Sequence, residues 1–326
     1  MLLSELLTIK YGKNQSEVEN QSGKYPIYGT SGIFSYADKY IYNKPSILIG
    51  RKGSIDKIQY VDSPFWCVDT AFYTEINEDI VIPKYLYYKL LNVNLKELDE
   101  GTTIPSLRTE TLNKIKLNID NTETQQHIVD SIGSVDDAIE KNEEIIDKLE
   151  AYADKYYDIY TNIDSDELLK LGDCANIATG KLNANASSEN GQYKFFTCSH
   201  EDLKIDTYSF DCEAIILSGN GEIEVKYYKG KFDAYQRAYV LCPDKYFFLF
   251  LIELKRQINN LKSSSQGSVI KFITKGMIEN ITININNQSI KYNETISKIY
   301  HYTHNFKNQN EQYKNIKQLL LSKYFD

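Results

Sequence analysis

Several features that mark particular protein classes are scarce or missing in this sequence. Its 326 residues include only 6 Pro and 16 Gly, and 42% are hydrophobic, so the chain is neither fibrous nor fully disordered. The longest apolar run, Tyr246 to Ile252, ends at Glu253, far short of the roughly 20 residues of a membrane span. The N-terminal segment carries Glu5 and lacks the charged-then-apolar pattern of a signal peptide. We therefore expect a globular protein with no membrane partner.

Metal and cofactor motifs are also missing. The five cysteines contain no C-x-x-C pair, which favours reduced thiols in a cytoplasmic protein. His301 and His304 are two of only four histidines and have no nearby thiolate, so we expect no metal. The chain has no P-loop, no glycine-rich dinucleotide loop and no Asn/Asp-Pro-Pro-aromatic motif of adenine methyltransferases. The sequence predicts no cofactor.

Positive charge is in the minority. Lys and Arg number 37 against 45 Asp and Glu, which gives a net charge of −8. We therefore do not expect a wholly basic nucleic-acid binder, although a local basic face is compatible with this net charge. Tyrosine is abundant, with 27 residues against a single Trp, and phenol rings suit both half-buried strands and polar binding surfaces.

The sequence contains an internal repeat at an offset of 168 residues, with a slip of two residues in the middle. The matched pairs are Gly12-Lys13 with Gly180-Lys181, Gly23 to Tyr25 with Gly191 to Tyr193, Ile47 to Gly53 with Ile215 to Gly221, Gly101 to Ile104 with Gly267 to Ile270, and Lys155 to Asp158 with Lys323 to Asp326. A single frame over the whole length indicates a duplicated domain.

Each copy opens with about 120 residues of short strand-like segments. In the first copy these are Ile47–Gly50, Ile55–Val61, Phe65–Thr74 and Ile115–Ile119. A helix is expected from Pro83 to Leu91, and Pro243 is expected to open the matching helix in the second copy, because proline suits the first helical turn.

Each copy ends in about 40 residues with a heptad pattern. The first seam reads Ile128, Ile132, Val135, Ile139, Asn142, Ile146, Leu149, Ala153, Tyr156 and Tyr160 and spans roughly 48 Å. The second reads Tyr292, Ile296, Ile299, Thr303, Phe306, Asn310 and Tyr313, and then shifts by one residue to Ile316, Leu320 and Tyr324. Neither helix can bury its stripe alone, so we expect an antiparallel coiled coil. Asn142 and Asn310 would then meet and fix the helix register, unless each is merely solvated at the seam edge.

This order of motifs resembles the specificity subunit of type I restriction–modification systems. The resemblance rests on Tyr25-Pro-Ile-Tyr-Gly-Thr-Ser-Gly32, Ile49-Gly-Arg-Lys-Gly-Ser54, Phe65-Trp-Cys-Val-Asp-Thr-Ala-Phe72, Gly101-Thr-Thr-Ile-Pro-Ser-Leu107 and Gln125-Gln-His-Ile128 before a heptad helix. It covers the whole chain. It implies an α+β fold with target-recognition domains at residues 1–122 and 163–286 and heptad helices at residues 123–162 and 287–326.

The resemblance also implies a function. Members of this family are not catalytic; they read a two-part, asymmetric sequence in double-stranded DNA and dock methyltransferase subunits, here expected to be two, through their helices. Restriction subunits join through the assembled complex. One nuclease-like coincidence, Asp244 followed by Glu253 and Lys255, is set aside because the segment between reads as one helix and the first copy has Lys84 in place of the acid.

Candidate DNA-binding residues lie in three loops of the first copy. Arg51, Lys52 and Ser54 stand among glycines, where a backbone can approach phosphate, and arginine is the usual bidentate reader of guanine. The other candidates supply hydroxyls: Tyr28, Thr30, Ser31, Thr102 and Thr103. Ordinary glycine turns with solvated or capping side chains would explain the same pattern.

The second copy offers different side chains at matching places. The candidates are Ser199, Asn220, Arg237 and Ser268. Asparagine is the usual reader of adenine, and Arg237 either reaches a base or pairs with a nearby acid. The alternative function is a duplicated coiled-coil scaffold that binds proteins rather than DNA. Clustering of the cations on one face would favour DNA.

Overall fold

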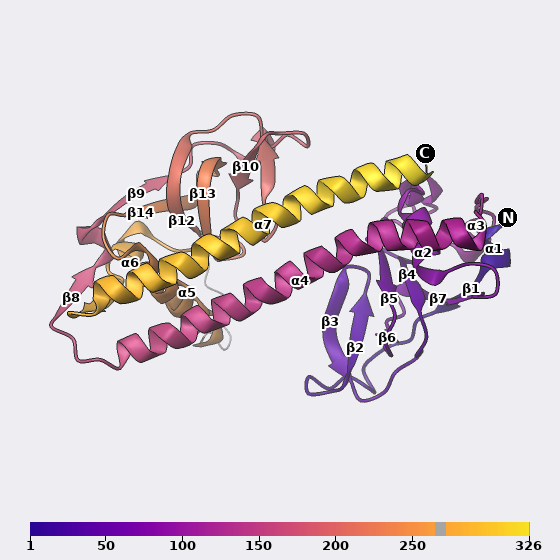
Figure 1. Cartoon of the computed structure of the whole chain (residues 1–326), viewed down its shortest axis with the longest axis horizontal. Coiled ribbons are helices and arrows are strands. Elements are labelled where there is room, and N and C mark those ends of the chain that lie inside the picture. Colours follow the sequence, from indigo (N-terminus) through magenta and orange to yellow (C-terminus); the bar gives the residue numbers. More distant parts are fainter. Residues whose placement is uncertain (265–271, 326) are drawn as a thin grey trace. The chain divides into compact units, whose positions relative to one another are not determined.

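The computed structural model describes residues 1–264 and 272–325, which form two units (Figure 1). One unit comprises Met1–Ile139 with Gln312–Asp326, and the other comprises Glu140–Glu311. The first unit therefore holds the first copy of the repeat and the second unit the second copy. Two long helices contribute to both units. No helix in the described part of the chain is long and apolar enough to cross a membrane.

The first unit is built on two small sheets. Its elements are α1 (Leu3–Leu6), β1 (Leu7–Tyr11), β2 (Tyr25–Gly29), β3 (Gly32–Ala37), β4 (Ser46–Gly50), β5 (Ile58–Val61), β6 (Trp66–Cys67), β7 (Ala71–Ile76), α2 (Pro83–Leu91), a 3-10 turn at Leu95–Leu98 and α3 (Thr109–Leu112). The strand orders are β1-β7-β4-β5 and β3-β2-β6. All these pairs are antiparallel except β2 with β6.

The second unit has one larger sheet. Its elements are β8 (Glu167–Lys170), β9 (Ala175–Thr179), β10 (Tyr193–Phe196), β11 (Leu203–Ile205), β12 (Phe210–Ser218), β13 (Val225–Ala234), β14 (Ala238–Pro243), α5 (Phe247–Ser264), α6 (Lys275–Glu279) and β15 (Thr282–Ile285), with 3-10 turns at Leu171–Asp173 and Ala184–Ala186. Six strands follow the order β11-β10-β13-β12-β14-β9, and β15 pairs with β8.

The two units share one topology. The long strand β13 of the second unit corresponds to β5 and β6 of the first, which are separate strands there. With that substitution the six-stranded order matches β3-β2-β6 continued by β5-β4-β7-β1. The parallel pairing is also equivalent, since Ile27 faces Trp66 and Phe195 faces Asp233. The duplication predicted from the sequence is confirmed at the level of strand pairing.

Matching glycines lie where the chain passes close to its own backbone. A Cβ atom at Gly12 would overlap the carbonyl oxygen of Val68, and one at Gly180 would overlap that of Ala234. The amide nitrogens of these glycines donate to equivalent carbonyls, those of Ala71 and Ala238, at 3.1 and 3.2 Å. Glycine is needed at both positions because any side chain would have to displace backbone.

Three local predictions were wrong. The expected strand Phe65–Thr74 is interrupted by a turn in which the amide of Ala71 bonds back to the carbonyl of Val68. The segment Ile115–Ile119 forms only an isolated bridge between Lys116 and Leu2, because the chain after Leu2 turns into helix α1.

The third error concerns Pro243, which ends strand β14 opposite Ala175 and does not open a helix. Helix α5 begins at Phe247. Its first amides, those of Phe248 and Leu249, are capped by the side-chain oxygen of Asn293 at 2.9 and 3.3 Å. This cap is contributed from a distant part of the chain, so the local sequence does not indicate it.

The long helices are α4 (Thr122–Thr161) and α7 (Ser289–Phe325), and they run antiparallel within each unit. In the first unit His127 lies against Tyr324, and Asp136 pairs with Lys317. In the second unit the rings of Tyr156 and Tyr292 stack at 4.4 Å between centroids, and the Lys307 ammonium lies 2.9 Å from the Glu150 carboxylate. The predicted pairing is confirmed.

The expected shift of the second seam is wrong. Ile316 is 43% exposed, and the original spacing continues through Lys317. The Lys317 ammonium lies 2.7 Å from an Asp136 carboxylate oxygen and 5.5 Å from the ring centroid of Tyr88. A lysine is tolerated at this seam position because its aliphatic carbons can pack in the seam while its ammonium group pairs with Asp136 and lies near the ring of Tyr88.

The two seam asparagines meet in the second unit. The amide nitrogen of Asn142 donates to the side-chain oxygen of Asn310 at 2.8 Å. Both residues are buried, with 8% and 4% of their surface exposed. The predicted contact is confirmed, and the alternative that each is merely solvated at the seam edge is wrong.

We expect Gly12→Ala to destabilise the protein by about 1–3 kcal/mol, because the new methyl must displace the Val68 carbonyl. The matched control is Gly133→Ala in helix α4, where the nearest atom, the Lys84 ammonium, would be 3.6 Å away. The control should gain about 0.5–1 kcal/mol of helix stability. Urea unfolding compares the two variants, and equal midpoints would show that Gly12 has room for a side chain.

Replacing either seam asparagine by leucine should remove the hydrogen bond while the other amide stays buried. Replacing both should recover part of the packing, so the two changes should be coupled by about 0.5–3 kcal/mol. A double-mutant cycle from denaturant melts measures this coupling. Additive effects of the two substitutions would mean that the side chains do not interact.

Candidate nucleic-acid interface

Two loops of each unit are joined by backbone hydrogen bonds, and we call each such set the paired loops. In the first unit they are residues 50–54 and 68–70, where the amides of Arg51 and Lys52 donate to the Thr70 carbonyl at 2.9 and 3.1 Å. In the second unit they are residues 218–222 and 236–238, where the amide of Gly219 donates to the Arg237 carbonyl at 2.8 Å. The backbone holds these loops, so their exposed side chains are free to differ.

A third loop joins the paired loops of the first unit. The amide of Gly53 donates to the Pro105 carbonyl at 2.9 Å, and Thr102 and Thr103 are exposed beside it. Asp99 organises this loop, because one of its carboxylate oxygens accepts from the amides of Gly101 and Ser106 at 2.8 Å each. Those amide bonds hold the pKa of Asp99 below its usual value.

This arrangement brings together four residues predicted from the sequence. Arg51 and Lys52 project from one loop, and Thr102 and Thr103 lie on the neighbouring one. Ser54, in the same glycine loop as Arg51 and Lys52, is half-buried. The grouping offers two cations and two hydroxyls, which are suitable donors for phosphate oxygens and base edges.

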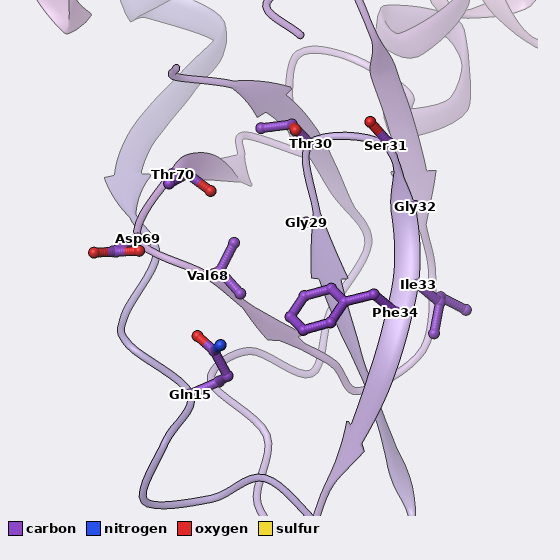
Figure 2. A pocket seen from close by; sticks show the side chains of 10 residues that line it. All are labelled: Gln15, Gly29, Thr30, Ser31, Gly32, Ile33, Phe34, Val68, Asp69 and Thr70. Carbon is purple, nitrogen blue, oxygen red and sulfur yellow. The ribbon is translucent and has the colours of Figure 1, made fainter. Parts of the chain in front are cut away.

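A pocket of about 400 Å³ opens beside the paired loops of the first unit. Thr30 and Ser31, at the turn between β2 and β3, lie across it from Asp69 and Thr70 (Figure 2). The ring of Phe34 extends from β3 into the same space (Figure 2). The two hydroxyls were predicted from the sequence, but the facing pair Asp69 and Thr70 was not, because these residues become neighbours of Thr30 and Ser31 only through the sheet.

Tyr28 does not join this group. It is half-buried, with its ring edge-on to Phe65 at 6.0 Å between centroids. Burial, together with the nearby Asp62 charge, raises the pKa of its hydroxyl. Its surroundings are those of a packing residue.

The second unit has a pocket of about 330 Å³ at its own paired loops. It is lined by Asn220 and Arg237, two of the candidate DNA-binding residues, together with Gln236 and Tyr239 and the 63% exposed Phe272. Arg237 has no carboxylate within 4.0 Å among residues 1–264 and 272–325, so the expected alternative of an ion pair is not found there. Two amides and a guanidinium suit adenine and guanine edges respectively.

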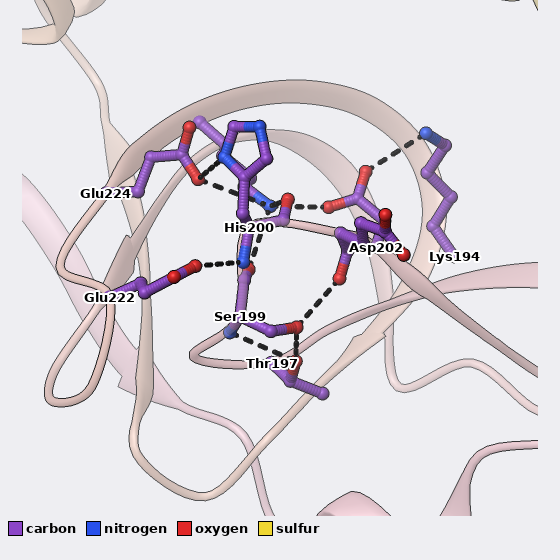
Figure 3. Close-up of polar contacts among 9 residues, drawn as sticks. Lys194, Thr197, Ser199, His200, Asp202, Glu222 and Glu224 are labelled. Atoms are coloured by element: carbon purple, nitrogen blue, oxygen red, sulfur yellow. Dashed lines mark hydrogen bonds and ion pairs between the residues drawn. The ribbon is translucent and has the colours of Figure 1, made fainter. Parts of the chain in front are cut away.

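Ser199 lies in a cluster of acidic side chains (Figure 3). Its hydroxyl donates to the Glu201 carbonyl at 2.8 Å and lies 2.8 Å from the Thr197 hydroxyl. Glu222 accepts from the His200 amide at 2.8 Å, and the Asp202 carboxylate holds Lys194 and Lys226. Carboxylates repel phosphate but accept hydrogen bonds from cytosine amino groups, so this cluster is better suited to a base edge. Ser268 lies outside the described residues.

Glu253 and Lys255 of the nuclease-like motif contact neighbouring side chains. The carboxylate of Glu253 accepts from the Tyr157 hydroxyl at 3.0 Å. The Lys255 ammonium lies 3.0 Å from Glu150 and 3.2 Å from the Tyr300 hydroxyl. Burial alone would lower the pKa of Lys255, but these two neighbours raise it above its usual value. Within the described residues, no group of three or more His, Cys, Asp or Glu side chains could hold a metal ion.

Comparisons with known proteins agree with this architecture. The model of the type I restriction modification DNA specificity domain matches residues 1–151 and again residues 166–321. The EcoDI type I restriction enzyme specificity subunit of Escherichia coli is 42% identical over 117 residues, which cover 35% of this chain and 26% of that protein. The MjaIX specificity subunit of Methanocaldococcus jannaschii is 24% identical over 87% of this chain and 77% of its own length.

A solved structure has the same fold. The S subunit of a type I restriction–modification system from M. genitalium superposes with a TM-score of 0.65 at 18% identity, covering 100% of this chain and 95% of that one. This chain uses one scaffold twice, and its two sets of paired loops carry different side chains. That combination is typical of a modular binding protein. The chain belongs to the type I restriction modification DNA specificity domain family, whose model matches it in two copies.

Removing the carboxylate of Asp99 should loosen the loop that carries Thr102 and Thr103. In Asp99→Ala, the amides of Gly101 and Ser106 lose their acceptor and should exchange hydrogen several-fold faster. Asp99→Asn keeps a side-chain oxygen and serves as the matched control. Hydrogen exchange followed by mass spectrometry reports the loop directly. Unchanged exchange in Asp99→Ala would show that the loop is held by other contacts.

Proposed function

We propose that this chain is the non-catalytic DNA-recognition subunit of a type I restriction–modification complex. Residues 1–122 and 163–286 act as two target-recognition domains, each reading one half of a bipartite, asymmetric target in double-stranded DNA. Residues 123–162 and 287–326 form the helices that join them. The similarity to the EcoDI and MjaIX specificity subunits supports this assignment; the match spans about a quarter of the length of the EcoDI subunit.

One observation carries the proposal. The paired loops recur at equivalent places in two copies of one scaffold, held by equivalent backbone bonds, while their side chains differ in charge and hydrogen-bonding groups. Lys52 corresponds to Asn220, and Ser54 to Glu222. A reader of two unrelated half-sites needs this combination of constant backbone and variable donors and acceptors.

The residues proposed to contact DNA are those predicted from the sequence, with one reassignment. In the first domain they are Thr30, Ser31, Arg51, Lys52, Ser54, Thr102 and Thr103. In the second they are Asn220, Arg237, Ser268 and the loop around Ser199. Tyr28 is reassigned to packing, because it is half-buried against Phe65.

The remaining parts of the proposal concern partners. The helices dock two methyltransferase subunits, and restriction subunits join through that assembly in the cytoplasm. The hydrogen bond between Asn142 and Asn310 is proposed to fix the helix register. On this proposal, a change of helix register is expected to alter the spacer of the target.

Methylome sequencing tests this function. A host that lacks other modification systems should receive the chain together with its modification subunit. We expect methylation at one asymmetric motif made of two short half-sites separated by a fixed, unspecified spacer. The two half-sites should depend on different domains, so side-chain changes in the paired loops of one domain should alter only one half.

Two controls accompany this experiment. The chain alone and the modification subunit alone should both give no motif, because neither contributes both recognition and chemistry. Methylation by the chain alone would contradict the non-catalytic assignment. A continuous motif that needs only one of the two domains would contradict bipartite recognition.

A further inference from the structure

Ion pairing divides the four arginines of the chain into two kinds. Arg108 lies 3.2 Å from a Glu100 carboxylate, and Arg256 lies 2.8 Å from that of Asp158. Arg51 and Arg237 have no carboxylate within 4.0 Å in the part of the chain that the structure describes. Both of these arginines lie in the paired loops. Since the chain has more acids than cations, an arginine in each copy with no acid near it among residues 1–264 and 272–325 is a feature that needs a reason.

The guanidinium of Arg51 is held from two sides. Its central carbon lies 5.1 Å from the ring centroid of Tyr11, and its Nη1 donates to the Asp69 carbonyl at 3.0 Å. Tyr11 is itself supported by the buried ring of Phe72, edge-on at 5.1 Å between centroids. The backbone of Arg51 is fixed as well, since its carbonyl accepts from the amide of Leu107 at 3.0 Å.

These contacts leave most of the guanidinium unused. Arginine has five N–H donors, and the Asp69 carbonyl takes one of them. Stacking on a ring occupies the face of the guanidinium and leaves its edge open. An edge held at a fixed orientation is what two parallel hydrogen bonds to the O6 and N7 atoms of guanine require.

The second copy has different side chains at the positions equivalent to Tyr11 and Arg51. Tyr11 and Arg51 correspond to Thr179 and Gly219, so neither the ring nor the guanidinium is present on that side. The guanidinium comes instead from Arg237 on the other paired loop, where it lines the open pocket with Asn220 and Gln236. The first copy therefore carries its arginine on the loop of residues 50–54, and the second copy carries it on the loop of residues 236–238.

We propose that Arg51 reads one guanine in the half-site of the first domain and that Tyr11 is the positioning residue that orients it. This inference rests on the function proposed above and names the base that this site recognises. It makes Tyr11, which lies directly before the repeated Gly-Lys motif, a determinant of specificity without contacting DNA itself.

The test uses the complex of the full chain with its modification subunit and compares the methylated motif of each variant. Arg51→Ala should relax one guanine of one half-site, with the preference over other bases falling roughly tenfold to hundredfold in competition binding. Arg51→Lys should relax the preference at the same position, because lysine keeps the charge but lacks the two parallel N–H donors of the guanidinium. Arg108→Ala removes the same charge from an acid-paired site and should leave the motif unchanged.

Tyr11 requires a matched pair of variants. Tyr11→Phe keeps the ring and should retain the wild-type preference for guanine. Tyr11→Leu should weaken that preference roughly threefold to tenfold, in line with the strength of a partly exposed cation–π contact. Melting temperatures of all variants are measured alongside. The half-site of the second domain is an internal control, since a general loss of stability lowers methylation of all sites without relaxing one base.

Each other outcome overturns a defined part of the inference. If Arg51→Ala weakens binding equally for every sequence and lowers the salt slope by about one, Arg51 contacts a phosphate and the guanine reading is wrong. If Tyr11→Leu keeps the wild-type preference while Arg51→Ala loses it, Tyr11 does not position the guanidinium. If the wild-type complex gives no bipartite motif, the proposed function itself fails.

Discussion

The two long helices each carry an apolar stripe that a single helix cannot bury, and this constraint underlies the rest of the structure. The first domain core takes Ile128 and Ile132 from α4 and Leu321 from α7. The second takes Tyr157 from α4 and Ile296 from α7 among its buried residues. Each domain is therefore completed by both helices. A duplicated chain satisfies this requirement directly, because every copy supplies one helix and needs the other.

Conservation of backbone contacts explains how the copies can differ at their surfaces. The close approaches at Gly12 and Gly180, and the amide bonds that join the paired loops, involve main-chain atoms. An exchange of Arg51 for Gly219, or of Tyr11 for Thr179, changes exposed groups and leaves those bonds in place. Such a scaffold allows a binding surface to vary without a change of fold.

The sequence predicted what repeats or follows a regular period, and it failed where distant contacts decide. The duplication, the long helices and the meeting of Asn142 with Asn310 all follow from spacing. Spacing alone does not predict that Lys317 occupies a seam position, because its charge is stabilised there by the Asp136 carboxylate and the ring of Tyr88. Likewise, the start of α5 depends on a cap from Asn293, and the stack of Tyr11 on Arg51 depends on the pairing of β1 with β7.

The charge of the chain limits how it can recognise DNA. With a net charge of −8, little affinity is expected from the release of counterions, and the exposed carboxylate of Glu222 near Ser199 would repel phosphates locally. A few placed contacts can still discriminate between bases, because each such contact depends on geometry and not on total charge. The guanidinium groups of Arg51 and Arg237, which have no carboxylate within 4.0 Å among the described residues, are candidates for such contacts. Discrimination between bases and overall affinity for DNA can then come from different groups. Under the function proposed above, this acidic chain contributes the selection, and we expect the subunits that clamp the duplex to contribute most of the affinity.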